Sequence, residues 1–396
     1  MQKKESRLSI LLGAAFLMAT SAIGPGFLTQ TSVFTEQLMA SMGFVILISI
    51  IIDIGAQVNI WRIIAVSEKR AQDIANMLVP GLGYFLAGLI VIGGLAFNIG
   101  NIAGAGLGIN VITGMDAKWG ALLSGLAAIG IFLVKEAGKA MDRFAQFMGF
   151  IMIVLAVYVM FTANPPYAEA AISTVVPAEI DLLAIVTLVG GTVGGYITFA
   201  GGHRLIDAGL TGKQNLPQVT KSAVSAIGIA SIMRIVLFLA VLGVVSQGLI
   251  LDEGNPAASV FKHAAGNVGY KIFGVIMWAA AVTSVVGAAY TSVSFIKTFS
   301  KFVERHQKWF IIAFIIISTI VFTTVGQPVK ILVLVGALNG LILPVALGVM
   351  LVAAYKKKIV GDYKQPLWLT IFGILIVVAM AIMGGYSLIN GVSKLL

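Results

Sequence analysis

Two short glycine-rich stretches decide how this chain folds. Residues 24–26 read Gly-Pro-Gly inside one long apolar segment, and residues 189–196 read Val-Gly-Gly-Thr-Val-Gly-Gly-Tyr inside another. Proline removes a backbone hydrogen-bond donor and clashes with the preceding turn, and glycine allows backbone angles that a helix forbids. Both stretches therefore predict helices that are interrupted near their centres.

The chain around these stretches is too apolar for a water-soluble protein. Of its 396 residues, 59% are hydrophobic and 11% are charged, and the mean hydropathy is +1.02. A soluble domain carries roughly 25% charged residues, so too few are present here to cover a surface that faces water. The composition predicts an all-α, polytopic membrane protein.

Eleven apolar segments are long enough to cross a bilayer, which takes roughly 20 residues. The expected spans are residues 8–40, 42–66, 80–112, 118–135, 141–163, 181–208, 219–250, 264–299, 309–325, 328–354 and 367–392. No small-residue cleavage site followed by a polar region comes after the first of them, so we expect a retained helix and not a cleaved signal peptide.

The basic residues indicate the orientation. Most of the 26 lysines and arginines fall in alternate connecting segments, which places those segments on one face of the membrane. Cytoplasmic loops carry such an excess, so we expect a cytoplasmic N-terminus and an external C-terminus in the cell (inner) membrane. The net charge of +10 has the same origin, and nucleic-acid binding is not expected because no soluble module is present to do it.

Several kinds of chemistry are excluded or disfavoured. The chain has no cysteine, which excludes disulfides, thiolate metal ligands and cysteine nucleophiles. No His/Glu cluster, Ser/His pair or pair of acids is placed together within the membrane, so we expect no enzymatic activity.

The two interruptions lie in the first and sixth spans, five spans apart. Breaks at corresponding positions in two halves mark the binding site of secondary transporters. In lipid, freed backbone groups are tolerated only where they line a cavity or are buried in protein. We therefore expect a central site between the two breaks and transport by alternating access, with a passive channel or facilitator as an alternative.

Several motifs resemble the Nramp family of transporters. They are Leu12-Gly13-Ala14-Ala15 and Gly24-Pro25-Gly26-Phe27 in span 1, Asn98 with Asn101-Ile102-Ala103-Gly104 in span 3, residues 189–196 in span 6, and Asn339-Gly340-Leu341 to Pro344 in span 10. The resemblance covers most of spans 1–10. It implies a LeuT-type fold with inverted repeats at residues 1–163 and 164–354, followed by a loop and an eleventh helix at residues 355–396.

The departures from the family pattern concern its functional residues. The metal-binding Asp of the family falls on Gly24, the metal-binding Asn on or beside Phe27, the metal-binding Met on Gly194, and the His after it on Tyr196; the two acids of its proton route fall on Asn98 and Asn101. Transition metals need carboxylate, imidazole or thioether donors, and Mg²⁺ needs one or two carboxylates. No metal site is therefore expected, and divalent-metal transport (Mn/Fe or Mg) is kept as an alternative.

A broken helix without an acidic side chain favours an anion. The free N–H groups at the start of each second half-helix carry a partial positive charge. The leading hypothesis is ion-coupled uptake of a small organic carboxylate or amino-acid-like solute. The candidate substrate contacts are Gly24, Pro25, Gly26, Phe27, Thr29, Gln30, Asn98, Asn101, Thr192, Gly194, Gly195 and Tyr196.

Ionisable residues within spans are candidates for coupling and gating. Glu36 is a candidate proton or cation site or a partner for a basic residue, and Asp53 is the stronger candidate for a buried charge. Arg234 must find an anion, either as a structural partner of one of these acids or as a substrate contact. His203, Arg204 and Asp207 at the end of span 6 are a candidate intracellular gate.

Span 8 supplies the last candidates. Thr283 and Ser284 match the position of Na⁺-holding hydroxyls in related folds, or else bond back within their own helix. The coupling ion is expected to be Na⁺ or H⁺, with no cofactor. The expected partners are a small-molecule substrate and the lipid bilayer, and the protein is expected to be a monomer.

Overall fold

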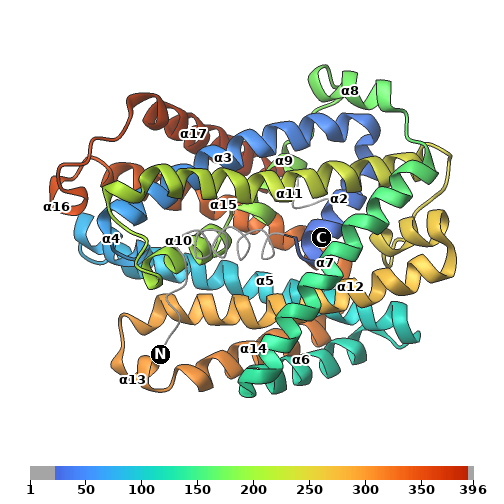
Figure 1. Ribbon diagram of the computed structural model, residues 1–396, viewed down its shortest axis with the longest axis horizontal. Coiled ribbons are helices and arrows are strands. Elements are labelled where there is room, and N and C mark those ends of the chain that lie inside the picture. The colour runs from blue at the N-terminus through green and yellow to red at the C-terminus, as the bar shows by residue number, and fades with distance from the viewer. Residues whose placement is uncertain (1–22, 391–396) are drawn as a thin grey trace.

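The computed structural model describes residues 23–390, and within that range every regular element is a helix (Figure 1). Nine helical segments of the described chain are long and apolar enough to cross a membrane, and α6 is a shorter apolar helix. One of the nine segments, Pro25–Ser67, joins two helices through a short turn. The protein is therefore a multi-pass membrane protein, as its composition predicts.

The long helices correspond to the expected spans. They are α2 (Pro25–Leu38), α3 (Met42–Ser67), α5 (Leu82–Thr113), α6 (Ala117–Leu133), α7 (Lys135–Ala163), α9 (Leu182–Thr192), α10 (Ile197–Asp207), α11 (Leu216–Val245), α12 (Pro256–Lys297), α14 (Gln307–Val325), α15 (Pro328–Ala353) and α17 (Leu367–Asn390). Shorter elements are η1 (Met39–Ser41), α4 (Ala71–Leu78), α8 (Tyr167–Val175), η2 (Lys213–Asn215), α13 (Lys301–Arg305) and α16 (Lys357–Val360).

The expected boundaries need three corrections. The helix of span 8 begins at Pro256 and not at 264, because Asn255 caps it by accepting a hydrogen bond from the Ala258 N–H, and the chain then kinks at Gly266. The helix of span 7 ends at Val245 and not at 250. Connecting segments expected to be plain loops contain α4 and α8. The first half of span 1 lies outside the described residues.

A helix begins at the first glycine-rich stretch, and the second stretch interrupts helical structure. Gly24 is extended and caps α2, which begins at Pro25. Four residues separate the end of α9 at Thr192 from the start of α10 at Ile197, and Gly195 among them has a φ of +53°. That left-handed conformation favours glycine because a Cβ would be strained there.

Helices α9 and α15, both in the second half of the chain, are in backbone contact. A Cβ added at Gly190 would overlap the carbonyl oxygen of Gly336 and the backbone of Gly340. A Cβ at Gly340 would in turn overlap the Val186 carbonyl oxygen. Small residues allow this close approach, which is how helices associate in lipid.

The connecting elements mark the two ends of the molecule. Helices α4, α13 and α16 lie at one end, on the left in Figure 1, and α8 lies at the opposite end. We call these the α16 end and the α8 end. The basic connecting segments around α4, α13 and α16 thus share one end, as the charge pattern predicts.

We expect Gly190→Ala to destabilise the protein because its methyl group has no room against α15. Overpacking of this kind costs about 1–3 kcal/mol. Thermal unfolding in detergent measures the effect. The matched control is Gly228→Ala in α11, where a Cβ would meet no atom within 4 Å. Equal melting temperatures for the two variants would contradict the close α9–α15 contact.

Candidate functional site

Arg234 joins the two broken helices. It lies in the middle of α11 and only 2% of it is exposed. Its Nη2 donates a hydrogen bond of 2.9 Å to the hydroxyl of Thr192, the last residue of α9. Its guanidinium carbon lies 4.4 Å from the ring centroid of Phe27, in the first turn of α2. One buried cation therefore touches the edge of both breaks.

Asp53 on α3 provides the opposite charge. It is also buried, and it attracts Arg234 electrostatically. Thr192 lies within hydrogen-bonding reach of the Asp53 carboxylate, so one hydroxyl stands between the acid and the base. The Asp53 Oδ1 and the Arg234 Nε have no hydrogen-bond partner. The two charged groups therefore keep unused capacity for a ligand, which is unusual because buried polar groups are normally paired.

This arrangement refines the expected pairing of Arg234. Asp53 is its charge partner, through Thr192. Glu36 is not: its carboxylate accepts a hydrogen bond of 2.9 Å from the Leu251 N–H, in the segment between α11 and α12. Glu36 thus holds a loop and lies away from the breaks.

The start of α2 adds positive potential beside Arg234. Pro25 has no N–H, and the first helical bond of α2 runs from the Leu28 N–H to the Gly24 carbonyl. The N–H groups of Gly26 and Phe27 come before that bond, at the positive end of the helix dipole. A negative group placed there would be stabilised by both the helix end and the guanidinium.

Two further polar residues follow in the next turn of α2. Gln30 is fully buried and donates from Nε2 to the Leu332 carbonyl of α15 at 2.7 Å, while its Oε1 faces Gly191 without a hydrogen-bond partner. The Thr29 hydroxyl is also buried and unpartnered. Both residues belong to the same region as the breaks, as expected from their positions after Gly26.

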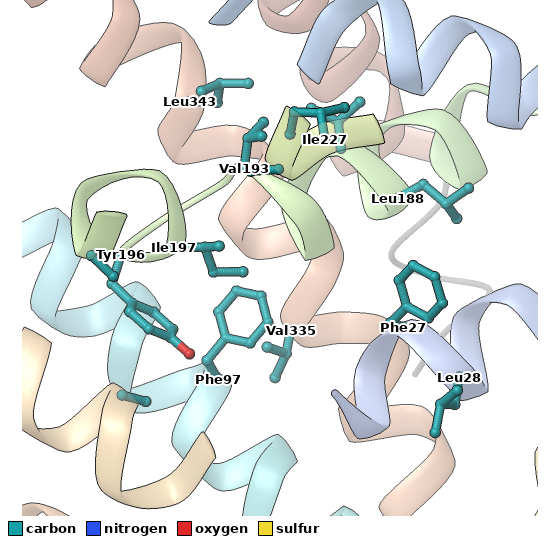
Figure 2. Packing of buried hydrophobic residues seen from close by; sticks show 14 of the residues in the cluster. Phe27, Leu28, Phe97, Leu188, Val193, Tyr196, Ile197, Ile227, Val335 and Leu343 are labelled. Atoms are coloured by element: carbon teal, nitrogen blue, oxygen red, sulfur yellow. The ribbon is translucent and has the colours of Figure 1, made fainter. Parts of the chain in front are cut away.

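The second break packs against α5 and α15. The Tyr196 ring meets Phe97 edge-on, with 5.4 Å between the ring centroids (Figure 2). Asn101, one turn after Phe97 in α5, lies near the Tyr196 hydroxyl, and its buried Nδ2 has no hydrogen-bond partner. A Cβ at Gly195 would overlap the side chain of Asn339, whose Nδ2 donates to the Gly93 carbonyl at 3.2 Å. The apolar surroundings drawn in Figure 2 enclose this region.

Two findings here differ from the sequence interpretation. Asn98 is directed to α14, where its Nδ2 donates to the Ser318 hydroxyl at 3.1 Å, while Asn101 meets the break. Asn339 contacts Gly195 directly, but the sequence analysis used it only as part of a family motif. A lone amide in an otherwise apolar helix was the signal that could have identified it.

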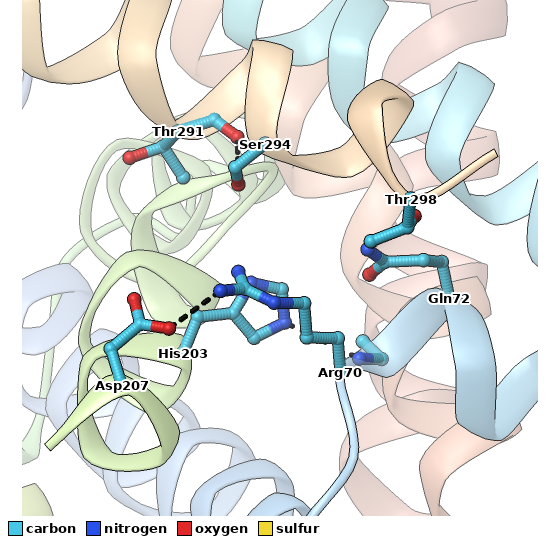
Figure 3. Close-up of polar contacts among 8 residues, drawn as sticks. Arg70, Gln72, His203, Asp207, Thr291, Ser294 and Thr298 are labelled. Carbon is cyan, nitrogen blue, oxygen red and sulfur yellow. Dashed lines mark hydrogen bonds and ion pairs between the residues drawn. The ribbon is translucent and has the colours of Figure 1, made fainter. Parts of the chain in front are cut away.

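The α16 end carries the expected gate residues (Figure 3). His203 is buried, accepts a hydrogen bond from the Ala71 N–H at 3.3 Å, and lies 4.9 Å from the Phe295 ring. Arg70 and Asp207 form an ion pair of 2.6 Å across the same junction. These contacts fasten α10 to the start of α4.

The remaining gate and coupling candidates are Arg204, Thr283 and Ser284. Arg204 is exposed. The Thr283 hydroxyl bonds to the Ala279 and Ala280 carbonyls of its own helix, and Ser284 is buried beside it.

Burial raises the pKa of Asp73 in α4, while Arg70 and Lys69 lower it. Among residues 23–390, no group of three or more His, Asp or Glu side chains is placed to hold a metal ion.

A helix break beside a buried polar centre, within a bundle of apolar spans, is typical of a membrane transporter. The chain belongs to the Nramp family, because the family model described as natural resistance-associated macrophage protein-like matches residues 15–390.

Two bacterial relatives match over nearly the whole chain. The Bacillus subtilis (strain 168) protein called uncharacterized membrane protein YcsG is 68% identical over 99% of this chain and 97% of its own length. An uncharacterized membrane protein of Haemophilus influenzae is 62% identical over 98% of each chain.

Solved structures establish the fold. A manganese transporter of Eremococcus coleocola, in complex with an aromatic bis-isothiourea compound, has a TM-score of 0.75 at 15% identity, covering 96% of this chain and 86% of that one. MhsT in complex with L-phenylalanine has a TM-score of 0.61 at 18% identity, covering 97% and 98%. The fold is therefore of the LeuT type, and it is shared by a manganese transporter and by a protein that binds L-phenylalanine.

We expect Thr192→Val to destabilise the protein, because it leaves Arg234 and Asp53 without the hydroxyl between them. Losing a hydrogen bond to a buried charged group costs about 1–3 kcal/mol. Thermal unfolding measures the loss. Thr192→Ser keeps the hydroxyl and is the control, so a loss of similar size in both variants would show that the destabilisation is not specific to the hydroxyl.

Proposed function

We propose that this transporter takes up a small organic carboxylate or amino-acid-like solute through a central site between α2 and the α9–α10 break. Arg234 carries this proposal, because its guanidinium contacts both breaks and its Nε is free to donate. A guanidinium binds a carboxylate through two parallel hydrogen bonds. The N–H groups of Gly26 and Phe27 supply further donors beside it.

The same charge disfavours a divalent metal as substrate. Arginine stays protonated in proteins, so a metal ion at the breaks would meet a permanent positive charge. Among the described residues there, the Asp53 carboxylate is the one donor of the kind that transition metals select, beside amides, hydroxyls and backbone groups, and its charge is balanced by Arg234. Manganese is the substrate named for the structural neighbour in Eremococcus coleocola, whose likeness concerns the fold.

Alternating access fits this site better than passive conduction. The residues around the breaks, including Phe27, Thr192 and Tyr196, are almost completely buried. The ion pair and histidine contact at the α16 end fasten α10, which continues directly from the break. Release of a substrate toward that end would require these contacts to open, and we propose that Na⁺ or H⁺ drives the cycle.

The substrate class is tested by ligand-dependent melting of the purified protein against L-lactate, pyruvate, L-alanine, L-proline, Mn²⁺ and Mg²⁺. A ligand that binds only the folded state, at 100 times its Kd, stabilises that state by about 2.7 kcal/mol. We expect a carboxylate to raise the melting temperature and the metals to have no specific effect. The rise should disappear in Arg234→Gln and persist at least in part in Arg234→Lys.

The opposite pattern would contradict the proposal. Stabilisation by Mn²⁺ or Mg²⁺ and by none of the four carboxylates would identify the protein as a metal transporter. Lys271→Gln is the control for loss of a positive charge. That lysine donates to the Val111 and Ile112 carbonyls at the C-terminal end of α5 and has no described contact with Thr192.

We also propose that the α16 end faces the cytoplasm of a cell whose plasma (inner) membrane holds the protein. The chain has no cysteine, so single cysteines report accessibility cleanly. In intact cells, a membrane-impermeant maleimide should label Glu179→Cys, between α8 and α9, and should leave Lys357→Cys in α16 unlabelled until the cells are opened. Labelling of Lys357→Cys alone in intact cells would reverse the orientation.

A further inference from the structure

The segment between α15 and α17 concentrates positive charge at the α16 end. Residues 354–366 join these two spans, and we call them the α16 connection. From residue 356 to residue 364 the sequence has four lysines and one aspartate, which gives this stretch a net charge of +3. The exposed lysines are Lys356, Lys357, Lys358 and Lys364.

The protein itself does little to neutralise this charge. The Lys357 Nζ lies 3.8 Å from the Asp362 carboxylate, and the two side chains are 86% and 83% exposed. An ion pair so open to water contributes little free energy. Between residues 23 and 390, no other ion pair involves a lysine of this connection. The positive charge is therefore available to a partner.

The two ends of the connection mark the level of the lipid headgroups. Tyr355, just after α15, is 59% exposed, and Trp368, in the first turn of α17, is 66% exposed. Exposed tyrosine and tryptophan rings at the ends of spans lie at the boundary between membrane and water. The lysines come between these two rings along a short connection, so we expect their long side chains to reach headgroup phosphates.

Helix α16 presents its charge from a packed base. Ile359 and Val360 are buried and α16 contacts α3, whereas Lys357 and Lys358 are exposed. The helix lies at the edge of the molecule in Figure 1. A surface that is already held in place loses little conformational entropy when it binds a partner.

A chain of hydrogen bonds holds the second half of the connection. The Tyr363 hydroxyl accepts from Nε and Nη2 of Arg62, at 3.2 and 3.1 Å, and donates to Gln365 at 2.5 Å. The Gln365 Nε2 donates to Asn59 of α3 at 2.8 Å. Arg62 also donates to the Thr220 hydroxyl of α11 at 2.8 Å. The connection is thus tied to α3 and, through Arg62, to α11.

We propose that the lysines of the α16 connection bind the headgroups of anionic phospholipids. Clustered lysines beside a membrane attract negatively charged lipids, and the phosphate of the headgroup is the chemistry that the ammonium groups recognise. This surface is distinct from the central site and does not depend on which solute is carried, so the inference goes beyond the proposed function.

A second basic segment at the same end provides the comparison. Helix α13 carries Lys301 and Arg305, but Glu304 lies beside Arg305 and three residues after Lys301. Opposite charges at this helical spacing attract each other. The three consecutive lysines of the α16 connection have no acid among them. We therefore expect anionic lipid to bind the α16 connection more strongly than α13.

Lipid-dependent melting of the full-length protein in detergent tests the site. Dioctanoyl phosphatidylglycerol is the anionic probe, dioctanoyl phosphatidylcholine is the lipid without net charge, and inorganic phosphate is the free anion. We expect phosphatidylglycerol to raise the melting temperature, and phosphatidylcholine and inorganic phosphate to leave it unchanged. The rise should shrink in about 0.5 M NaCl, because salt screens exposed charges.

Two variants locate the effect. Replacing Lys356, Lys357 and Lys358 together by glutamine should weaken the apparent affinity for phosphatidylglycerol roughly 100-fold, about fivefold for each lysine. Tyr363→Phe breaks the chain of hydrogen bonds and keeps the lysines, so it should lower the melting temperature in both lipids and retain the rise with phosphatidylglycerol.

The matched control removes the same number of positive charges near α13. Replacing Lys301, Arg305 and Lys308 together by glutamine should weaken the affinity far less than the triple change in the α16 connection. Equal weakening would assign the effect to the whole charged end and overturn the α16 site.

Two further outcomes would overturn the proposal on the wild-type protein alone, even if a variant failed to fold. Equal stabilisation by phosphatidylglycerol and phosphatidylcholine would show that the headgroup charge has no role. A rise with inorganic phosphate as large as that with phosphatidylglycerol would show that the connection binds free anions and not lipid.

Discussion

Backbone groups freed by a broken helix find no water inside a bilayer, and this constraint governs the rest of the structure. The break between Thr192 and Ile197 must be buried in protein, so neighbouring helices approach it closely. Gly190 lets α9 touch α15 backbone to backbone, and Gly195 gives room to the side chain of Asn339. The fully buried surroundings of Phe27 and Tyr196 follow from the same requirement.

The polar centre lies beside the ends of these closely packed helices. Where α2 begins and α9 ends, the helix dipoles present a positive and a negative end respectively. Arg234 lies against both, and its charge is balanced by Asp53 through a single hydroxyl. Shared contacts of this kind tie four helices, α2, α3, α9 and α11, to one small group of side chains. A movement of either broken helix must therefore change the surroundings of a charge.

The sequence was enough to predict the apolar spans, the start of a helix at Pro25 and the break between Thr192 and Ile197, because hydropathy and glycine-rich signals are local properties. Family resemblance added the topology. The partners of individual side chains were a different matter: the sequence left Arg234 open between Asp53 and Glu36, placed Asn98 beside Asn101, and gave no special role to Asn339. These choices depend on which helix faces project inward, and Thr192 became informative only once α3, α9 and α11 were seen together.

The fold of the family and the side chains of the site therefore determine different properties of the protein. The fold is found in a manganese transporter and in a protein that binds L-phenylalanine, so it does not by itself specify what a central site binds. What the site binds depends on the net charge that the side chains set there. Positions at which the Nramp resemblance would place metal ligands are occupied here by Gly24, Gly194 and Tyr196, and a guanidinium lies between the breaks. At these positions the chain therefore lacks the side chains with which the resemblance would place a metal ion, and a buried pair of opposite charges, Arg234 and Asp53, lies beside them.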